Sequence, residues 1–392
     1  MNIEDPTPLL GNLSPREFMR DIWQRQPLLI RQAIPGFEPT ITLADIKALA
    51  RREEAESRLI WHNDKGWKMK AGPFPRLSLP RQAAWTLLVQ SVDLHDDAIA
   101  ALMRRFRFIA DARLDDAMIS IANDGGGVGP HYDSYDVFLL QAHGQRRWRI
   151  STQTDLSLEP GLPLKILSNF EAEHEYLLNP GDMLYLPPHI CHDGVAVGDC
   201  MTISIGFRVP SQAALARGML EAAADQISAQ YWGEPGLYGE PALPGADLSS
   251  LYTDAGTDAT ATPAALPEQL VQATLETLKK VRLDQAVAAR FLGQWLSNRP
   301  ENAWFEPMQN PPTLAQTLPE TGRLVLDRCT RLMYFEDQLF INGELAPVIN
   351  DSVLRQLADE RELTYHAMQS LGMAARTMLD EWLDEGWLHY EA

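Results

Sequence analysis

Between residues 116 and 209 the chain is a series of short apolar or alternating runs, and this pattern restricts the fold more than any other feature. Glycine, proline and aspartate separate the runs, and these residues favour turns. The runs are DAMISIA, YDVFLLQA, RRWRIS, LPLKIL, EHEYLLNPGDMLYLPP and MTISIGFRV. Many short strands at close spacing are typical of a β-sandwich or a small barrel, so we expect one of these here.

Stretches with helical character precede the short runs. In SPREFMRDIWQRQPLLI, Ser14 is placed to cap a helix and Pro15 to occupy its first position, and the helix should end near Gln26–Pro27. The stretches SLPRQAAWTLLVQSV and DDAIAALMRRF are also predicted to be helical. Residues 1–210 are therefore predicted to form one α+β domain, a β-sandwich or small barrel with surrounding helices.

The next section, residues 211–300, is predicted to be helical. Apolar residues recur there every four positions, at Leu215, Met219, Ala223, Ile227 and Tyr231. Residues 240–266 are rich in Gly, Pro, Ala, Ser and Thr, which predicts a flexible insertion. The apolar stripes could pack within one chain or against a second copy, and the sequence leaves both possibilities open.

Residues 301–392 mix both types of element. Asn342-Gly343 in LFINGELAPVI is a hairpin signal, and DSVLRQLADE, ELTYHAMQSLGM and ARTMLDEWLDEGWLHY are predicted to be helices. Two short strands with three helices suggest a winged-helix module, with Trp382, Trp387 and Tyr390 in its core. Residues 321–392 hold six arginines, no lysine and thirteen acidic residues, so this module is expected to contact protein and not DNA.

Composition and charge exclude several classes of protein. The chain has 34 basic and 53 acidic residues, a net charge of −19, which argues against a nucleic-acid backbone as the main partner. No basic segment followed by an apolar core opens the chain, and no run approaches the ~18 apolar residues of a membrane span. Cys191, Cys200 and Cys329 are few and scattered, so we expect a reduced, cytoplasmic protein without disulfides.

The octet GPHYDSYD, residues 129–136, follows three glycines and holds the first candidate metal ligands. If HYDSYDVFLL forms a strand, alternate side chains share a face, so His131, Asp133 and Tyr135 project together. The side chains that would face away are Tyr132, Ser134 and Asp136. An imidazole nitrogen and a carboxylate oxygen are two of the three ligands that hold non-haem Fe(II) and leave positions open.

The third ligand must come from another strand, and YLPPHICHDGVAVG offers His189 and His192. Asp182 after Gly181 marks a turn into MLYLPP, which would place the residues after that strand at the rim of a barrel. Other histidines have no partner at ligand spacing: His62, His95, His143, His366 and His389.

Three motifs in this order, GGGVGPHYD, GQRRWRI and LPPHICH, resemble the JmjC-type 2-oxoglutarate oxygenases. The family pattern is a glycine-rich lead, His-x-Asp, Gly-x-Lys/Arg-x-Trp and Pro-Pro-x-x-x-His. Its register makes His192 the third ligand, in place of His189, and Arg146 the basic residue. DDAMISIANDGGGVGPHYDSYDVFLLQAHGQRRWRI and GFRVPS further resemble the bacterial ribosomal oxygenases, a similarity that covers essentially the whole chain and is strongest over residues 113–208.

The resemblance implies a double-stranded β-helix of the cupin/JmjC type, a helical dimerisation segment and a terminal winged helix. It implies Fe(II) held by His131, Asp133 and His192, with 2-oxoglutarate and molecular oxygen as co-substrates. Known members hydroxylate an arginine of a large-subunit ribosomal protein, the one numbered sixteen. The expected partners are therefore a basic ribosomal protein and a second copy of the chain.

The residues fit 2-oxoglutarate independently of the resemblance. Its far carboxylate needs a cation, and a guanidinium fork suits a carboxylate in a bidentate arrangement. Arg146 shares strand parity with Trp148 and Ile150 and could point inward, leaving Arg147 and Arg149 outside. Ser120 and Ser204 are candidate hydroxyl partners for the same carboxylate.

Two further residues are candidates for contacting the substrate. Asp124 could pair with a substrate guanidinium, or it could simply start the glycine turn. Tyr135 could form a wall of the substrate slot, or it could belong to the core. Two other functions remain open: a small-molecule cupin oxygenase, and a non-catalytic scaffold that binds a basic partner.

Overall fold

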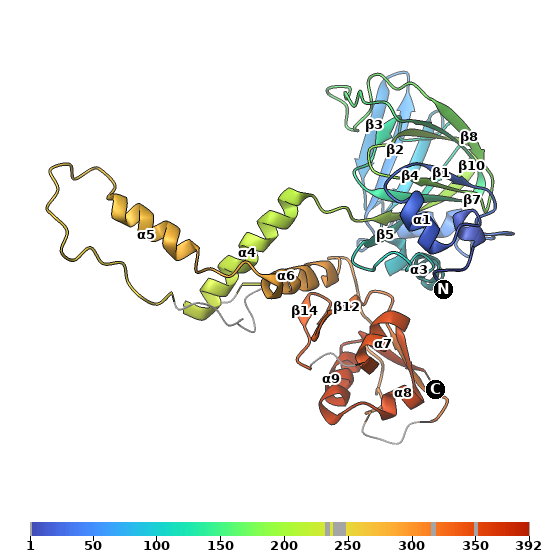
Figure 1. The fold of residues 1–392 in the computed structure, drawn as a ribbon. Helices are drawn as coiled ribbons and strands as arrows, with labels where there is room; N and C mark the ends of the chain where they lie inside the picture. The colour runs from blue at the N-terminus through green and yellow to red at the C-terminus, as the bar shows by residue number, and fades with distance from the viewer. Residues whose placement is uncertain (1, 232–235, 238–247, 315–318, 349–351, 392) are drawn as a thin grey trace. The chain divides into compact units, whose positions relative to one another are not determined.

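The structure, a computed structural model, describes residues 2–231, 236–237, 248–314, 319–348 and 352–391. It divides the chain into two compact units, drawn in Figure 1: Met1–Val209 with Pro300–Phe305, and Pro210–Arg299 with Glu306–Ala392. Helices and strands are mixed throughout, which confirms the predicted α+β class. The division at residues 210 and 300 and the winged-helix assignment stay predictions.

The first unit is built on one large antiparallel sheet. Its elements are α1 (Pro15–Asp21), β1 (Leu28–Ile30), α2 (Leu43–Leu49), β2 (Ser57–Asn63), β3 (Gly66–Ala71), β4 (Ala84–Val89), α3 (Asp97–Arg104), β5 (Leu114–Ala122), β6 (His131–Tyr132), β7 (Asp136–Ser151), β8 (His174–Leu178), β9 (Met183–Leu186) and β10 (Cys191–Phe207). The strand order is β1-β9-β7-β10-β5-β4-β2-β3, with β6 paired to β10 and β8 to β7. The long strands β7 and β10 therefore carry both the core and the region of the predicted ligands.

An aromatic cluster joins the N-terminal segment to this sheet. The ring of Phe18 lies 5.1 Å from that of Tyr185 and 5.5 Å from that of Phe138, and Trp23 stacks on Tyr185 at 5.6 Å. Phe18, Phe138 and Tyr185 are fully buried. Aromatic side chains contribute large buried areas, so this cluster is a major source of the first unit's stability.

The first helix begins where the sequence predicts and ends earlier. Ser14 and Glu17 form a capping box, in which the Glu17 amide donates to Ser14 Oγ at 3.2 Å. The predicted end near Gln26–Pro27 is wrong, because α1 stops at Asp21. Gln24 adopts a left-handed φ of 56° and its amide donates to the Tyr185 hydroxyl, so a tertiary contact takes the backbone out of the helix.

Two predictions of local structure are wrong. SLPRQAAWTLLVQSV contains the strand β4 instead of a helix, because β2 and β5 pair with it on either side. A short apolar run buried on both faces fits either element by pattern alone. LPLKIL forms no strand beyond a single bridge between Leu167 and Leu158, since the Leu167 amide donates to the Pro130 carbonyl at 2.8 Å.

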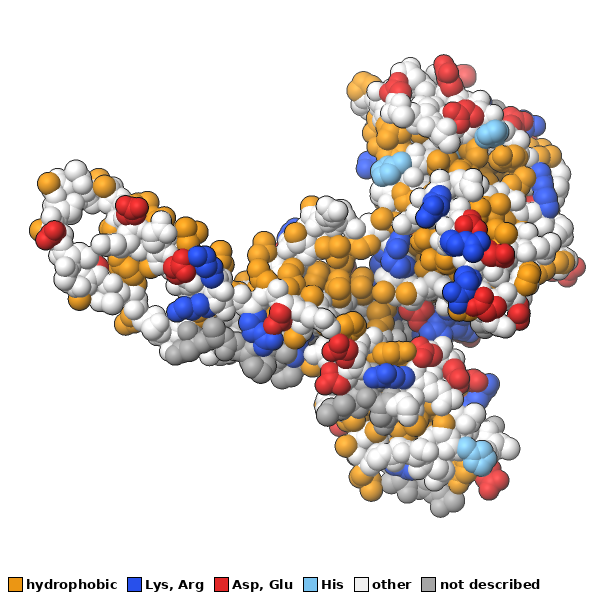
Figure 2. All heavy atoms as spheres, in the orientation of Figure 1, with side chains coloured by type: hydrophobic (Ala, Val, Ile, Leu, Met, Phe, Trp, Pro, Cys, Tyr) orange, Lys and Arg blue, Asp and Glu red, His pale blue; other side chains and the backbone are white. Residues whose placement is uncertain are grey.

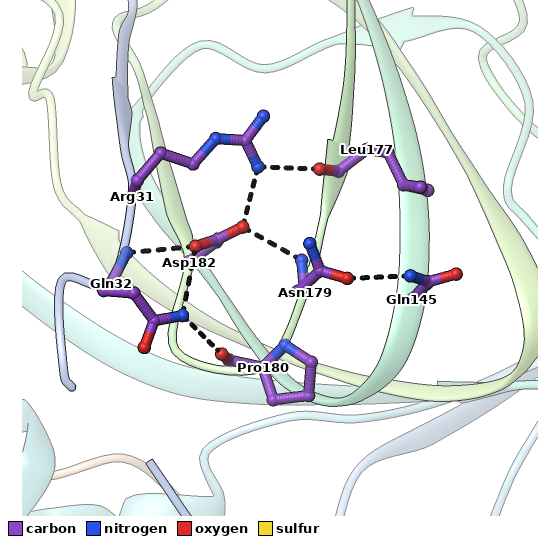
Figure 3. A network of polar contacts seen from close by, with 7 residues as sticks. All are labelled: Arg31, Gln32, Gln145, Leu177, Asn179, Pro180 and Asp182. Atoms are coloured by element: carbon purple, nitrogen blue, oxygen red, sulfur yellow. Dashed lines mark hydrogen bonds and ion pairs between the residues drawn. The ribbon is translucent and has the colours of Figure 1, made fainter. Parts of the chain in front are cut away.

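Asp182 fixes the turn that leads into β9, as the sequence predicts for a residue that follows Gly181. Figure 3 shows its buried carboxylate accepting hydrogen bonds from the Gln32 amide at 3.0 Å, the Asn179 amide at 3.1 Å and Arg31 Nη1 at 2.7 Å. Burial raises the pKa of Asp182, but these donors outweigh it and hold the pKa below its usual range. The carboxylate thus ties the chain after β1 to the turn before β9.

The second unit contains α4 (Gln212–Tyr231), α5 (Glu268–Leu278), α6 (Gln285–Ser297), β11 (Arg323–Leu326), β12 (Leu332–Phe335), β13 (Gln338–Ile341), β14 (Glu344–Leu345), α7 (Ser352–Glu360), β15 (Glu362–Thr364), α8 (Tyr365–Gln369), α9 (Met373–Asp384) and β16 (Leu388–Glu391). Two small sheets have the orders β15-β11-β16 and β12-β13-β14. α4 packs on α6 through Ala222, Val287 and Phe291, whereas α5 buries none of its residues.

Part of the predicted flexible insertion, residues 240–247, lies outside the described residues. Residues 248–266 are described and contain neither helix nor strand. The Asn342-Gly343 hairpin is confirmed: both residues have positive φ, 49° and 92°, between β13 and β14. In ELTYHAMQSLGM the helix is shorter than predicted, because Glu362–Thr364 pairs with β11 as the strand β15.

A core of its own supports residues 301–392. Trp382 is buried in it, and Trp387 and Tyr390 pack against it, which confirms their predicted place in the core of this module. No disulfide joins the three cysteines, all of which are described and buried. Among the residues that the structure describes, no helix combines the length and the apolar character that crossing a bilayer requires.

An ion pair in the same unit makes its stability depend on pH. His389 Nε2 lies 2.8 Å from Asp327 Oδ2, and this hydrogen bond raises the pKa of His389 above its ordinary 6.5. The stabilisation is therefore fully present below pH 6.5 and is lost as the pH rises through the raised pKa.

We expect His389→Gln to lower the free energy of unfolding by about 1 kcal/mol at acidic pH and by much less once the pH has risen through the raised pKa of His389. Urea denaturation of wild type and variant at both pH values measures this difference. His366→Gln, at an exposed histidine, is the control and should show no such dependence on pH. An equal loss at both pH values would contradict the role of the charge.

Candidate metal centre

The three predicted ligands come together at one point of the barrel. The potential ligand atoms of His131, Asp133 and His192 all lie within 4.8 Å of one another, and His192 Nε2 is 3.6 Å from Asp133 Oδ2. His192 is buried and the other two are half-buried. Within the described ranges this is the one cluster of three or more such side chains. Two imidazoles and one carboxylate form the donor set that suits Fe(II).

Strand pairing positions the two histidines. In the two-residue strand β6, His131 lies directly opposite His192 of β10, and the rings are 4.2 Å apart. Directly opposed residues of an antiparallel pair have their side chains on the same face. The pairing therefore brings together two residues that are far apart in the sequence, and it selects His192 over His189.

The predicted strand HYDSYDVFLL is interrupted, so strand parity does not place Asp133. Residues 133–135 form a loop between β6 and β7. The His189 amide donates to the Asp133 carbonyl at 2.7 Å, with His189 at a left-handed φ of 67°. Asp136 points away as predicted, because its buried carboxylate accepts from the Tyr185 hydroxyl at 2.7 Å. The hydrogen bond to its backbone carbonyl therefore orients Asp133, and not the alternation of side chains along a strand.

Both histidines are prepared to bind through Nε2. His131 Nδ1 donates to the Gly129 carbonyl and His192 Nδ1 to the Ile190 carbonyl, each at 2.9 Å. A protonated Nδ1 leaves the Nε2 lone pair for a metal ion. Burial, and then the neighbouring His131, hold the pKa of His192 at about 4, well below its ordinary 6.5. His192 is therefore a neutral ligand at physiological pH.

The glycines before the octet allow backbones to approach closely. A Cβ on Gly127 would lie 2.7 Å from the Gly194 carbonyl oxygen, and one on Gly126 would lie 2.8 Å from the Asn123 carbonyl oxygen. The amide of Ala196 also donates to the Gly126 carbonyl at 2.8 Å. The glycine run therefore packs against β10 next to the metal cluster, where no side chain fits.

Arg146 points inward from β7, as strand parity predicts. It is 5% exposed, whereas the side chains of Arg147 and Arg149 are 49% and 43% exposed and pair with Glu175 and Asp193. Arg146 Nη1 donates to Ser120 Oγ at 3.3 Å and Nη2 to Cys200 Sγ at 3.5 Å.

The guanidinium of Arg146 forms no ion pair with any residue that the structure describes, and its buried Nε has no acceptor there. A buried charge without a partner is costly, so this position is built for an anionic ligand.

Trp148 links the guanidinium to the metal cluster. Its ring centroid lies 5.8 Å from the Arg146 guanidinium carbon and 5.8 Å from the His192 ring. Its buried indole N–H has no acceptor among the described residues. Arg146 Nε and the Trp148 indole N–H are thus two buried donors without acceptors, and they lie close to each other and to His192. Such donors are expected in a pocket that holds a ligand rich in oxygen atoms.

Gly194 makes room for this tryptophan. It lies opposite Trp148 in the β7–β10 ladder, and a Cβ there would be 2.6 Å from the Trp148 ring. We expect Gly194→Ala to lower the free energy of unfolding by about 1–3 kcal/mol, because overpacking displaces the indole. Urea denaturation measures the loss. Gly372→Ala, where nothing lies within 4 Å, is the control, and equal values for the two variants would contradict the packing argument.

The two candidate serines differ in their contacts. Ser120 reaches the guanidinium, whereas Ser204 lies opposite Met118 and forms no hydrogen bond with Arg146. Both side chains are buried on the same face of the sheet. The structure therefore brings Ser120 to Arg146 and leaves Ser204 without a hydrogen bond to it.

The candidate substrate contacts also differ. Asp124 Oδ1 accepts from the Gly198 amide at 2.8 Å on the surface, which favours its interpretation as a turn residue. Tyr135 is 39% exposed beside the ligand loop. Burial of its phenol end and the charges of Asp133 and Asp116 raise the pKa of Tyr135, so it stays protonated. Sequence reasoning missed Asp116, although positions 116, 118 and 120 of β5 share the face of Ser120.

Comparison with known proteins agrees with this geometry. The JmjC domain family matches residues 101–215. The ribosomal protein uL16 3-hydroxylase of Escherichia coli is 31% identical over 356 residues, 89% of each chain, and a probable ribosomal oxygenase of Haemophilus influenzae is 31% identical over 96% of each.

The chain belongs to the JmjC-domain ribosomal oxygenases.

A solved structure extends this assignment to the fold. The E. coli ribosomal oxygenase YcfD, determined in complex with cobalt and 2-oxoglutarate, superposes on the oxygenase with a TM-score of 0.77 at 28% identity, covering 97% of this chain and 99% of that one. The predicted cupin/JmjC barrel is thereby confirmed. Membership of an oxygenase family also removes the non-catalytic scaffold suggested as an alternative.

Proposed function

We propose that this oxygenase is an Fe(II)- and 2-oxoglutarate-dependent hydroxylase that modifies an arginine of the large-subunit ribosomal protein uL16. The observation that carries the proposal is the buried, unpaired guanidinium of Arg146 beside the cluster of His131, Asp133 and His192. The names of the relatives support the substrate: one is a uL16 3-hydroxylase. Arginine as the target residue comes from the resemblance of the sequence to the bacterial subgroup.

The donor set fits Fe(II). His131 and His192 offer Nε2 and Asp133 offers a carboxylate oxygen, two soft-to-intermediate ligands and one hard one, a set that leaves positions open. Fe(II) bound there would supply activation of molecular oxygen coupled to decarboxylation of 2-oxoglutarate. The Gly129 and Ile190 carbonyls would keep the two imidazoles in the correct tautomer and orientation.

Arg146 and Ser120 fit the far carboxylate of 2-oxoglutarate. A guanidinium fork binds a carboxylate through two parallel hydrogen bonds, and the Ser120 hydroxyl already lies 3.3 Å from Arg146 Nη1. Trp148 offers a further buried N–H donor in the same pocket. Ser204 would have a secondary role in binding this carboxylate. It lies opposite Met118 in the pairing of β5 and β10 and forms no hydrogen bond with Arg146.

Tyr135 and Asp116 suit a cationic side chain of the substrate. Tyr135 belongs to the ligand loop and is close enough to Asp116 of β5 for that carboxylate to raise its pKa, and its protonated hydroxyl can donate or accept. The Asp116 carboxylate, which accepts from the Ser91 amide at 2.9 Å, would supply the negative charge that a guanidinium requires. We assign this role to Asp116 in place of Asp124, whose carboxylate holds the Gly198 turn.

A homodimer through residues 211–300 is part of the proposal. Leu270, Val271, Leu275 and Leu278 of α5 and Leu220 of α4 are exposed apolar residues. Figure 2 shows hydrophobic side chains gathered over α4 and α6. Burial of such a surface against a second copy is the expected outcome for exposed apolar helices. In this proposal residues 301–392 form a winged-helix domain for protein contacts, and the protein acts in the cytoplasm.

The function is tested by incubating the purified protein with Fe(II), 2-oxoglutarate and uL16 of E. coli. We expect formation of succinate and a gain in the mass of uL16 equal to one oxygen atom, with fragmentation placing the oxygen on an arginine. Reactions without 2-oxoglutarate and with His131→Ala are the controls. Succinate without modified uL16 would contradict the substrate, and no succinate above the control would contradict the reaction.

A further inference from the structure

The hairpin of β2 and β3 extends the inner face of the barrel beyond the metal cluster. Ser120 of β5 lies opposite Leu88 of β4, and Leu88 lies opposite Arg58 of β2. Because alternate residues share a face, His62 belongs to the same face as Arg58. Its partner on β3 is Trp67, and Met69 follows two residues later. His62, Trp67 and Met69, here called the hairpin platform, thus share the face of Ser120.

The platform touches the segment that holds the first metal ligand. A Cβ on Gly129 would lie 3.0 Å from Trp67 Cζ2, so the indole packs directly against that glycine. The Gly129 carbonyl is also the acceptor that orients His131. The rings of His62 and Trp67 are 4.7 Å apart, and Met69 is 38% exposed. An accessible surface of two aromatic rings and a thioether therefore begins beside the metal cluster.

The opposite face of the same strand has a different character. Lys68 and Lys70 alternate with the platform residues along β3, and with Lys65 the hairpin holds three of the chain's seven lysines. β3 stands at the end of the sheet, where lysines hinder unspecific pairing of an edge strand. A basic partner would be repelled by the lysines, which disfavours its binding to that face.

We propose that the hairpin platform binds the segment of the substrate protein that flanks the target residue. This rests on the proposed function, in which the substrate is a basic polypeptide far larger than the pocket. The chain that leaves the pocket must cross a surface continuous with it, and the platform is such a surface. Arginine or lysine side chains suit the rings of Trp67 and His62, and an apolar side chain suits the adaptable Met69.

The test compares two substitutions on neighbouring positions of one strand. Met69→Lys places a positive charge on the platform, which would repel a basic partner, whereas Lys70→Asp changes charge on the opposite face and serves as the matched control. With intact E. coli uL16, we expect Met69→Lys to raise KM about tenfold with kcat retained, equivalent to about 1.4 kcal/mol. Lys70→Asp should leave KM unchanged or lower it. With a short peptide of the target residue and its immediate neighbours, Met69→Lys should have the same KM as wild type.

Three results would contradict the proposed role of the platform in binding the substrate. These are an unchanged KM for uL16 in Met69→Lys, an equal rise in Lys70→Asp, or an equal rise with the short peptide, which would indicate a general structural effect. Mn(II) affinity and circular dichroism of the variants verify an intact barrel. If wild type does not hydroxylate uL16, the proposed function fails and the platform fails with it. If wild type hydroxylates uL16 and the KM of Met69→Lys is unchanged, only the proposed role of the platform fails.

Discussion

Asp133→Ala is expected to reduce the affinity for Mn(II) or Fe(II) by at least about 100-fold and to abolish hydroxylation. The change removes the one anionic donor of the cluster and leaves two neutral imidazoles, which hold a divalent ion less tightly. The fold should survive, because the variant keeps the Asp133 backbone carbonyl, which accepts from the His189 amide and fixes the loop. Titration of Mn(II) followed by electron paramagnetic resonance measures the loss.

Ser134→Ala is the matched control for this experiment, since Ser134 is the exposed neighbour of Asp133 in the same loop. It should bind Mn(II) as wild type does. If Asp133→Ala also bound Mn(II) as wild type does, the ion would have to sit elsewhere. His131, Asp133 and His192 would then be a polar cluster without a metal.

Arg146→Met is expected to weaken the binding of 2-oxoglutarate without lowering the stability of the protein when 2-oxoglutarate is absent. It should weaken 2-oxoglutarate binding at least about 100-fold, because truncating one partner of a buried ion pair costs about 2–5 kcal/mol. Without 2-oxoglutarate it should leave the free energy of unfolding unchanged or raise it, because methionine occupies a similar volume without burying an unpaired charge. Calorimetric titration of the Mn(II)-loaded protein and urea denaturation measure the two effects.

Arg147→Met is the control on the neighbouring residue, whose side chain is 49% exposed and paired with Glu175. It should change neither quantity by more than a few tenths of a kcal/mol. A large loss of stability in Arg146→Met without 2-oxoglutarate would mean that the guanidinium is a structural element. In that case another cation would have to receive the co-substrate.

The metal ligands could be predicted from sequence because the chemistry restricts them to a few residue types at fixed positions in a motif. The orientation of Asp133 could not, because it depends on the His189 amide, which lies far along the chain. Arg146 was predictable because it lies within a long uninterrupted strand, where alternation decides which side chains point inward.

Local structure was harder to predict where tertiary contacts decide it. The run AWTLLV has no periodicity that separates a helix from a strand buried on both faces, and only pairing with β2 and β5 selects β4. The end of α1 depends on a contact between Gln24 and Tyr185, which lie on different elements. Asp116 was missed for the same reason, since its proximity to Tyr135 follows from folding and not from spacing.

The two-residue strand β6 has a consequence for how the barrel holds together. Its pairing with β10 closes a loop of sixty residues between His131 and His192, and so short a strand supplies few hydrogen bonds to maintain that closure. A metal ion bound by both histidines would act as a cross-link between the ends of this loop and lower the entropy of its open states. The ion would then stabilise the fold in addition to its role in the reaction. The amides of β6 should therefore exchange hydrogen more slowly once the ion is bound.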